Sequence, residues 1–395
     1  QLSKYKAKKS FLKIKILFVK EKKKLIVSGI NLFEGGPLSI IIDCLNYLND
    51  SKYIEEYNIT ALVHKKKLFD HSKYNNIKFL EFPKSRISYV YRLYYEYYYF
   101  KRFAKKNNVS FWFSLHDISP SLGNNIPQAV YCHNPSPFKK VKTKDLFSEP
   151  KFFFFTLFYR FLYQINIRKN KFIIVQQHWI RNEFIKMFHL KQDNIIVSPP
   201  IVPQFLKSDK NENIVSIYKE QKTFFYPTLA RSFKNIEVIC EAVKLMDEKE
   251  LKRFQIIITI DGTENNYSKK ILSKYKRELP IKFIGRITRE EVYAYYNLVD
   301  CLIFPSKLET WGLPITEFKQ FNKPIFISNL PYAKETINGY DKVNYFTPEN
   351  PKELSMLISN LLNENLTFSV SKEIEPAKPL ANNWKELFDI LLLKE

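Results

Sequence analysis

Cysteine and long apolar runs are both scarce in this sequence of 395 residues. The four cysteines, Cys44, Cys132, Cys240 and Cys301, stand singly inside apolar runs, and no C-x-x-C pair occurs. This pattern excludes a zinc or disulfide framework and is typical of buried thiols in a reducing compartment. The longest uncharged apolar stretch, residues 152–159, is well short of the ~20 residues that a spanning helix needs. The sequence therefore argues against a transmembrane protein.

Glycine is scarce as well, because the chain has eight where ordinary usage would supply ~28. In such a chain each glycine is expected to serve a backbone need, such as a left-handed turn or a close approach to a ligand. Most of the eight follow short apolar, β-branched runs. They therefore mark the joints between strands and loops.

Apolar runs alternate with longer amphipathic segments along the chain. The runs expected to form strands are residues 25–27, 59–63, 77–82, 109–113, 129–132, 172–175, 223–226, 254–260, 281–284, 301–304, 324–327 and 343–346. Helix-like segments lie between them, in the first half at residues 38–48, 89–105, 152–167 and 179–188. This alternation predicts an α/β fold of two doubly wound, Rossmann-like domains, which bind ligands at the carboxyl ends of their strands.

The domain boundaries follow from composition. Residues 198–221 contain three prolines and then a polar run. We therefore expect an N-terminal domain at 1–200 with a basic leader at 1–24, a linker at 201–222, a C-terminal domain at 223–375, and a final helix within 376–395 that packs back on the N-terminal domain. The leader has ten lysines but no small-residue cleavage site, so it does not match a signal peptide.

Basic residues are concentrated in the first half of the chain. Positions 1–200 hold 35 of the 63 Lys and Arg but only 14 of the 40 Asp and Glu, so they carry +21 of the net charge of +23. Residues 89–106 combine nine aromatic with five basic side chains, which suits the headgroup zone of an anionic membrane. The helical spacing of these aromatics equally fits a stripe that faces the core.

Three loops in the first half carry candidate ligand-binding residues. Gly35 and Gly36 precede a helix, where they either admit an anion to its N-terminus or form a tight turn. His133 opens the loop HNPSPF at a strand end, where it either donates to a ligand or caps the loop. Asp117 follows another strand end and either orients an acceptor hydroxyl or acts as a cap.

Two motifs in the second half carry charge at strand ends. Arg231 and Lys234 stand three positions apart before a helix, a spacing that suits a diphosphate, although a solvated basic turn is the alternative. The motif PSKLETWGLPITE, residues 305–317, places Glu309 on a loop and Glu317 about one turn into the helix that starts near Leu313. The two acids can therefore hold separate parts of one long ligand.

This second motif resembles the E-x7-E signature of the GT-B retaining glycosyltransferases, family 4 in particular. The agreement includes the GG loop, the HNPSPF loop, R-x-x-KN at 231–235 and KFIGRI at 282–287, all in the same order. It covers about residues 25–365, which is nearly the whole chain.

The resemblance implies a role for each matching position. Glu317 would hold the ribose hydroxyls of a nucleotide, and Glu309 would contact the donor sugar. Arg231 and Lys234 would neutralise the diphosphate. Backbone amides would assist them from Thr310, Trp311, Gly312 and Leu313.

The remaining positions concern the base and the acceptor. Gly285 would let the backbone touch the base. His133, with the loop of Gly35 and Gly36, would line the sugar and acceptor side. Asp117 would join His133 and Glu309 in the catalytic set. No D-x-D occurs in the chain, so we expect no metal ion, and no cofactor beyond the nucleotide-sugar co-substrate.

The resemblance implies a hexosyl or deoxyhexosyl glycosyltransferase that moves a sugar from a nucleotide sugar to a saccharide acceptor, with retention of configuration. A lipid-linked acceptor in bacterial surface polysaccharide synthesis, of O-antigen or capsule, is favoured by the basic first half. The expected location is cytoplasmic, peripheral on the inner face of the cytoplasmic membrane, with no nucleic acid partner. A sugar-nucleotide epimerase on the same scaffold and a basic nucleic-acid-binding protein are the alternatives.

Overall fold

The structure is a computed structural model that describes residues 21–138, 150–201, 221–275 and 279–393. Most of the predicted leader and of the predicted linker lies outside these ranges. The chain forms two compact units. Unit 1 contains the chain up to Cys132, Leu162–Ile174 and the end from Phe388, whereas unit 2 contains His133–Phe161 and Val175–Leu387.

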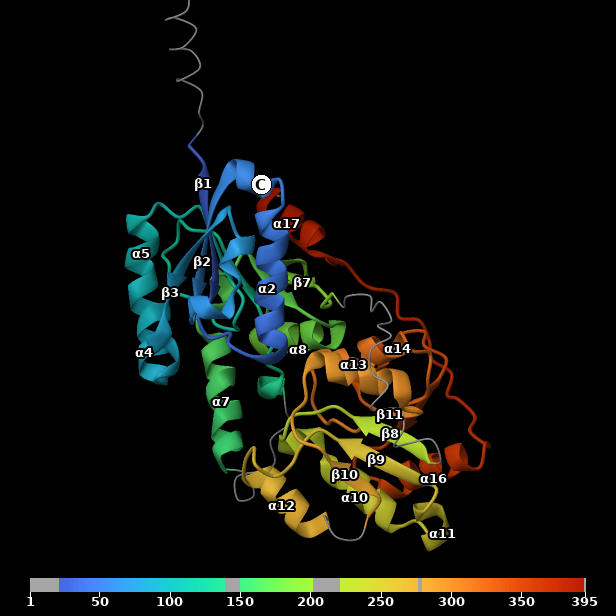
Figure 1. Cartoon of the computed structure of the whole chain (residues 1–395). Helices are drawn as coiled ribbons and strands as arrows, with labels where there is room; N and C mark the ends of the chain where they lie inside the picture. The colour runs from blue at the N-terminus through green and yellow to red at the C-terminus, as the bar shows by residue number, and fades with distance from the viewer. Residues whose placement is uncertain (1–20, 139–149, 202–220, 276–278, 394–395) are drawn as a thin grey trace, which may run out of the picture. The chain divides into compact units, whose positions relative to one another are not determined.

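The first sheet has seven strands in the order β3-β2-β1-β4-β5-β6-β7. Its strands are β1 (Lys23–Gly29), β2 (Tyr57–Val63), β3 (Ile77–Glu81), β4 (Phe111–Ser114), β5 (Gln128–Tyr131), β6 (Phe172–Val175) and β7 (Ile195–Val197). The helices of unit 1 between these strands are α2 (Gly35–Asn49), α3 (Tyr53–Glu56), α4 (Tyr89–Tyr94) and α5 (Phe100–Lys106), with a π-helical segment, Tyr95–Tyr99, joining α4 to α5. Figure 1 shows α2 on one side of the unit 1 strands and α4 and α5 on the other.

The second sheet lies in unit 2 and has six strands in the order β10-β9-β8-β11-β12-β13. They are β8 (Lys222–Tyr226), β9 (Phe254–Ile258), β10 (Ile281–Phe283), β11 (Cys301–Phe304), β12 (Ile325–Ser328) and β13 (Val343–Phe346). The helices of unit 2 are α7 (Pro150–Gln164, whose last turn belongs to unit 1), α8 (His178–Phe188), α10 (Ile236–Lys244), α11 (Glu248–Leu251), α12 (Asn266–Tyr275), α13 (Arg289–Leu298), α14 (Leu313–Lys319), α15 (Pro331–Ile337) and α16 (Pro351–Leu362). α10 and α12 lie on one face of this sheet and α13 and α14 on the other (Figure 1).

The central strands are apolar on both faces because helices cover both sides of each sheet. Every residue of β4, β9, β11 and β12 is buried. The pairings that join β8 to β9 and to β11, and β1 to β2 and to β4, are all parallel. The predicted fold class, two doubly wound α/β domains, is confirmed.

The strand orders locate two switch points. The chain leaves β1 toward β2 on one side and later returns to β4 on the other, and β8 stands in the same relation to β9 and β11. Ligands of such sheets bind outside the carboxyl ends of the strands at these points. A ligand-binding site is therefore expected at the loops that follow β8 and β11.

The final helix, α17 (Trp384–Leu393), adds its last residues to unit 1. The Phe388 ring stacks on Tyr47 with ring centroids 6.0 Å apart, and the Tyr53 hydroxyl donates to Asp389 Oδ1 at 2.6 Å. No helix in the described ranges is long and apolar enough to cross a bilayer.

Candidate functional site

The turn after β8 and the loop after β11 are joined by a main-chain hydrogen bond, in which Lys307 N donates to the Phe233 carbonyl at 2.7 Å. The Tyr226 hydroxyl, at the end of β8, donates to the Lys234 carbonyl at 2.8 Å and fixes the same turn. Both carbonyls belong to a short 3-10 turn, η8 (Ser232–Lys234). Neighbouring parallel strands thus bring the two charged motifs of the second half together at one edge of the sheet.

Lys234 and Glu309 form an ion pair between these two loops. Their side chains are only 17% and 13% exposed, so the pair is largely shielded from water. Arg231 opens the same turn with an exposed side chain. One cation therefore faces the Glu309 carboxylate directly, while a second stands three residues away at the surface.

Asn235 fixes the basic turn to its surroundings. Its backbone is left-handed, with φ of 58°, a conformation that asparagine adopts more easily than most residues. The buried side-chain amide donates to the carbonyls of Pro305 at 3.1 Å and Pro348 at 2.8 Å. Asn235 therefore ties the Lys234 turn to the start of the Glu309 loop.

Glu317 lies in α14, eight positions after Glu309, in a different environment. Its side chain is 9% exposed, with Oε1 at 3.1 Å from Arg289 Nη2 and Oε2 accepting from the Tyr296 hydroxyl at 3.2 Å. Burial raises the pKa of the Glu317 carboxyl, and Arg289 and Tyr296 oppose that shift. This is a buried acid held by partners from α13.

The loop between the two acids contains a sharp turn at Gly312. Its φ of 83° is left-handed, and a Cβ there would come within 2.7 Å of Ile315 Cδ1. Leu313 then begins α14. Thr310 and Trp311 precede the turn, and the Trp311 indole N–H donates to Thr316 Oγ1 at 2.8 Å. The left-handed backbone therefore favours glycine at this position, just before α14.

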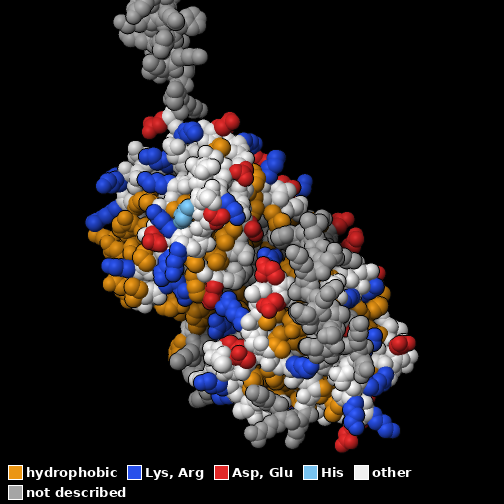
Figure 2. Space-filling model, viewed as in Figure 1, with side chains coloured by type: hydrophobic (Ala, Val, Ile, Leu, Met, Phe, Trp, Pro, Cys, Tyr) orange, Lys and Arg blue, Asp and Glu red, His pale blue; other side chains and the backbone are white. Residues whose placement is uncertain are grey.

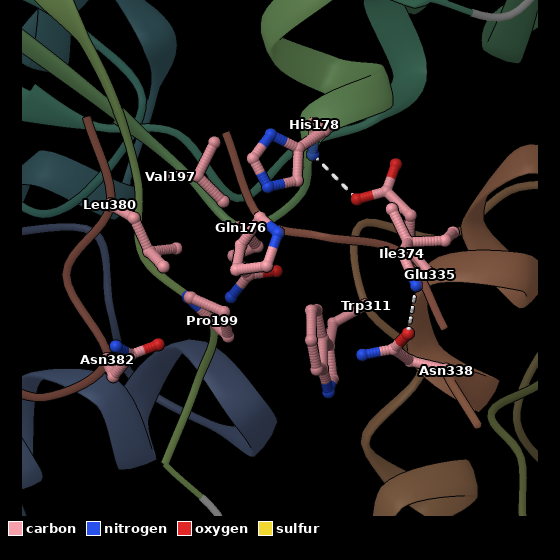
Figure 3. Close-up of a pocket in the computed structure, with 11 residues that line it drawn as sticks. Gln176, His178, Val197, Pro199, Trp311, Glu335, Asn338, Ile374, Leu380 and Asn382 are labelled. Carbon is pink, nitrogen blue, oxygen red and sulfur yellow. Dashed lines mark hydrogen bonds between the residues drawn. The ribbon is translucent and has the colours of Figure 1, made fainter. Parts of the chain in front are cut away.

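The Trp311 side chain lines a pocket of about 150 Å³ in unit 2 that opens to solvent (Figure 3). Figure 3 also shows the backbone N–H of His178 directed at the Glu335 carboxylate, a hydrogen bond of 2.7 Å at the start of α8. Thr336, next along α15, donates to the Trp311 carbonyl and accepts from Gln177 Nε2 at 2.8 Å. The loop that carries Glu309 is thus also held by a hydrogen bond from α15.

Gly285 lies in a turn after β10 with φ of 76°. A Cβ there would be 2.7 Å from Asp261 Oδ2, and its N–H donates to the Ile260 carbonyl at 3.1 Å. The turn therefore lies close to the loop that follows β9, and its left-handed φ favours glycine.

The other predicted residues are distributed over both units. Gly35 begins α2 with a left-handed φ of 62° and Gly36 follows it. Asp117, with φ of 73°, accepts from the Tyr163 hydroxyl at 2.8 Å. These three lie in unit 1, whereas His133 lies in unit 2 with the residues of the second half. His133 precedes a turn in which Asn134 Oδ1 accepts from Ser136 N at 3.0 Å.

The sequence reasoning missed two groups of residues. Arg289 and Tyr296 hold Glu317, and the only signal for Arg289 was its place two residues after KFIGRI. In unit 1, Glu96 and His116 are wholly buried, with Oε1 and Nε2 3.3 Å apart, and Arg92 Nη2 donates to the His116 carbonyl at 3.0 Å. Nothing in the spacing of residues 89–106 pointed to a buried cluster of titratable side chains there.

Residues 207–382 match the family model described as "Glycosyl transferases group 1". The O-antigen chain mannosyltransferase RfbU of Salmonella typhimurium is 22% identical over 283 residues, which are 69% of this chain and 72% of that protein. The match between chain and family model thus covers the unit 2 sheet and its charged loops.

Two solved structures share the fold. A glycosyltransferase from Rickettsia africae aligns with a TM-score of 0.63 and 18% identity over 88% of this chain and 90% of its own. HepE from Anabaena, in complex with UDP-glucose, aligns with a TM-score of 0.61 and 14% identity over 86% of this chain and 90% of its own. The fold is that of the GT-B glycosyltransferases, and the family model supports a glycosyltransferase.

Proposed function

We propose that this chain is a retaining, metal-independent glycosyltransferase of family 4. It moves a hexosyl or deoxyhexosyl group from a nucleotide sugar to a saccharide acceptor of a bacterial surface polysaccharide. The observation that carries the proposal is the contact between Lys234 and Glu309. It joins a diphosphate-binding turn to a sugar-binding loop at the switch point of the unit 2 sheet.

The donor would be bound along this edge by groups of matching chemistry. Lys234 and the exposed Arg231 neutralise the diphosphate, since charge-assisted hydrogen bonds to phosphate are the strong ones. Glu317 accepts from the ribose hydroxyls and Glu309 from those of the sugar. The backbone at Gly285 approaches the base, and amides near Gly312 approach the diphosphate.

Transfer then depends on stabilising the departing nucleoside diphosphate, on which negative charge develops. Arg231 and Lys234 supply that stabilisation without a metal ion. The acceptor hydroxyl attacks from the face that the leaving group vacates, and a phosphate oxygen takes up its proton, so the anomeric configuration is retained. His133, Asp117 and the loop of Gly35 and Gly36 are assigned to the sugar and acceptor side.

The chemistry of the relatives narrows the substrate classes. HepE is described with UDP-glucose and RfbU as an O-antigen chain mannosyltransferase. A nucleotide-sugar donor and an O-antigen or capsule saccharide are therefore the substrates to test first. The acceptor is proposed to be lipid-linked, which places the enzyme on the inner face of the cytoplasmic membrane.

Unit 1 has an exposed aromatic surface that fits this location. We call it the tyrosine face, and it consists of Ile87, Tyr89, Val90, Tyr91, Tyr94 and Tyr98, all exposed. Ile87 lies just before α4, the next four lie within α4, and Tyr98 lies in the π-helical segment after it. In Figure 2 hydrophobic side chains gather on the same side of the molecule as α4, among Lys and Arg side chains. Lys84 lies over the Tyr91 ring and Arg102 over the Tyr98 ring. Apolar groups ringed by cations suit an anionic bilayer surface.

The decisive experiment offers the purified chain a panel of sugar nucleotides, with and without a lipid-linked saccharide. We expect nucleoside diphosphate to be released only when donor and acceptor are both present. The variant Arg231→Ala with Lys234→Ala should lose donor use. Conversion of a sugar nucleotide without an acceptor would identify an epimerase instead. Binding of oligonucleotides but of no sugar nucleotide would identify a nucleic-acid-binding protein.

A further inference from the structure

Arg289, one of the residues around Glu317, does not stabilise the helix to which it belongs. Arg289 is the first residue of α13, where Thr288 and Glu291 already form a capping box. A positive charge in the first turn of a helix is disfavoured by the helix dipole. Arg289 nevertheless directs Nη2 to Glu317 Oε1 at 3.1 Å. The Arg289 charge therefore stabilises Glu317 in α14 and not its own helix, α13.

We propose that Arg289 is a positioning residue that holds the Glu317 carboxylate ionised and turned toward the donor ribose. This inference rests on the proposed function, because it gives Glu317 the nucleotide as its ligand. Arg289 also lies four positions after Gly285, the residue assigned to the base. One side chain thus connects the two segments expected to hold the nucleoside.

Three side chains of α13 hold the Glu317 carboxylate. Arg289 Nη2 contacts Oε1, the Tyr296 hydroxyl donates to Oε2, and Tyr293 adds a further side-chain hydrogen bond. A carboxylate offers about four lone-pair sites, so these partners leave one for a ribose hydroxyl. The Arg289 side chain is 48% exposed and Glu317 is 9% exposed, so Arg289 reaches the acid from the solvent side.

The ionic state of Glu317 depends on this contact. Burial raises its pKa, and the charged or polar groups that face it, Arg289, Tyr296 and Tyr293, all come from α13 and oppose the shift. Arg289 is the one cation among them. Without it, Glu317 would take up a proton at a higher pH and would then bind the ribose less well. An opposite charge at this distance favours the ionised form of a carboxyl and so lowers its pKa.

The test measures sugar-nucleotide affinity from pH 5 to pH 9 by calorimetry. Sugar nucleotides are used because their diphosphate lacks the terminal phosphate ionisation near pH 6. UDP-glucose, GDP-mannose and ADP-glucose are screened, and the one that binds the unaltered chain most tightly is used. The variants are Arg289→Gln, Arg289→Lys, Glu317→Gln and Arg289→Gln with Glu317→Gln.

We expect affinity to fall on acidification, with a midpoint about 1 to 3 pH units higher in Arg289→Gln than in the unaltered chain. Arg289→Lys keeps the charge and should restore most of the original midpoint. Glu317→Gln should bind the sugar nucleotide weakly, with an affinity that does not change with pH. Adding Arg289→Gln to Glu317→Gln should change this affinity little, because the carboxylate through which Arg289 acts is gone.

Two results would overturn the inference while leaving the proposed function intact. One is a loss of affinity in Arg289→Gln that is equal at every pH. The other is that Arg289→Gln lowers the affinity of the Glu317→Gln variant as much as it lowers that of the unaltered chain, which would mean that Arg289 contacts the nucleotide itself. Should Arg289→Gln not fold, Arg289→Met carries the test, with Arg289→Lys as its charge-keeping control. The midpoint should rise in Arg289→Met and stay near the original value in Arg289→Lys; no rise in Arg289→Met overturns the inference. Failure of the unaltered chain to bind any sugar nucleotide removes the proposed function and this inference together.

Discussion

The Lys234 ammonium is paired with the Glu309 carboxylate, although the two side chains are assigned to different parts of one donor. In the free protein each therefore occupies the position that a ligand group would take. The diphosphate must compete with Glu309 for Lys234, and a sugar hydroxyl must compete with Lys234 for Glu309. The pair keeps both side chains ordered before the donor arrives, which lowers the entropy cost of binding.

This competition predicts opposite effects of two substitutions on product binding. Glu309→Gln should tighten nucleoside diphosphate binding by up to about fivefold, because Lys234 loses its competing partner. The same variant should lower kcat by about 10- to 100-fold, since the sugar loses a charged acceptor in the transition state. Lys234→Met should weaken nucleoside diphosphate binding by about 10- to 100-fold. Calorimetry and steady-state kinetics measure both effects. Equal weakening by the two variants would show that Glu309 orders Lys234 for the diphosphate and does not compete with it.

Asn235 provides a second test of how the two loops are held together. Asn235→Ala removes two buried hydrogen bonds and places alanine in a left-handed backbone, so it should cost about 2 to 4 kcal/mol of stability. Asn235→Gly loses the same hydrogen bonds but relieves the backbone strain, so it should cost about 1 kcal/mol less than alanine. Chemical denaturation, followed by circular dichroism, compares the two.

The same pair of variants also reports on the site. Both release the Lys234 turn from the Pro305 carbonyl, so KM for the donor should rise in both, whatever their difference in stability. Normal KM in a destabilised Asn235→Ala protein would mean that the turn keeps its place without this anchor.

Much of the fold was predictable because strands that are buried on both faces of a sheet appear in the sequence as short apolar runs. Residues 301–304 and 343–346 were predicted as strands and are β11 and β13. β7 was missed, because its three residues, Ile195–Val197, directly precede Ser198 and Pro199 and look like the start of a loop. The segment 89–105 was predicted as one helix, but five tyrosine-rich residues at its centre, Tyr95–Tyr99, are π-helical. Periodicity does not distinguish these two helix types over one turn.

The motif residues of the site were predictable from the sequence, but the contacts between elements distant in the sequence were less so. The motifs place Lys234 and Glu309 at strand ends, and adjacency of β8 and β11 then brings them together. Arg289 lies 28 positions before Glu317, and a basic residue at a helix start is usually solvated. The contact depends on how α13 and α14 pack on one face of the sheet, which local sequence does not specify.

The buried cluster in unit 1 predicts an unusual dependence of stability on pH. Burial raises the pKa of Glu96 to about 8, and Arg92 opposes that shift. The native state therefore keeps a proton that the unfolded chain releases near its ordinary value of 4.5. Stability from this group is complete below that value, is lost as pH rises toward about 8, and changes no further above it. The slope is at most about 1.4 kcal/mol per pH unit.

Glu96→Gln removes this titration. Thermal unfolding between pH 5 and pH 9 should show the unaltered chain losing stability relative to Glu96→Gln as pH rises. Glu56→Gln, which changes an exposed carboxylate in the same unit, is the matched control and should run parallel to the unaltered chain. A Glu96→Gln curve that also runs parallel would show that Glu96 is already ionised in the native state.

The tyrosine face predicts binding to anionic vesicles. Val90 is 74% exposed at its centre, so Val90→Glu should remove apolar contact and add a repelled charge, lowering the bound fraction at least about tenfold. Met356→Glu, at a 63% exposed position in unit 2, is the matched control and should leave binding unchanged. Co-sedimentation with phosphatidylglycerol vesicles measures the effect, and phosphatidylcholine vesicles should bind neither protein. Equal, negligible binding of the unaltered chain to both lipids would remove the membrane from the proposed function.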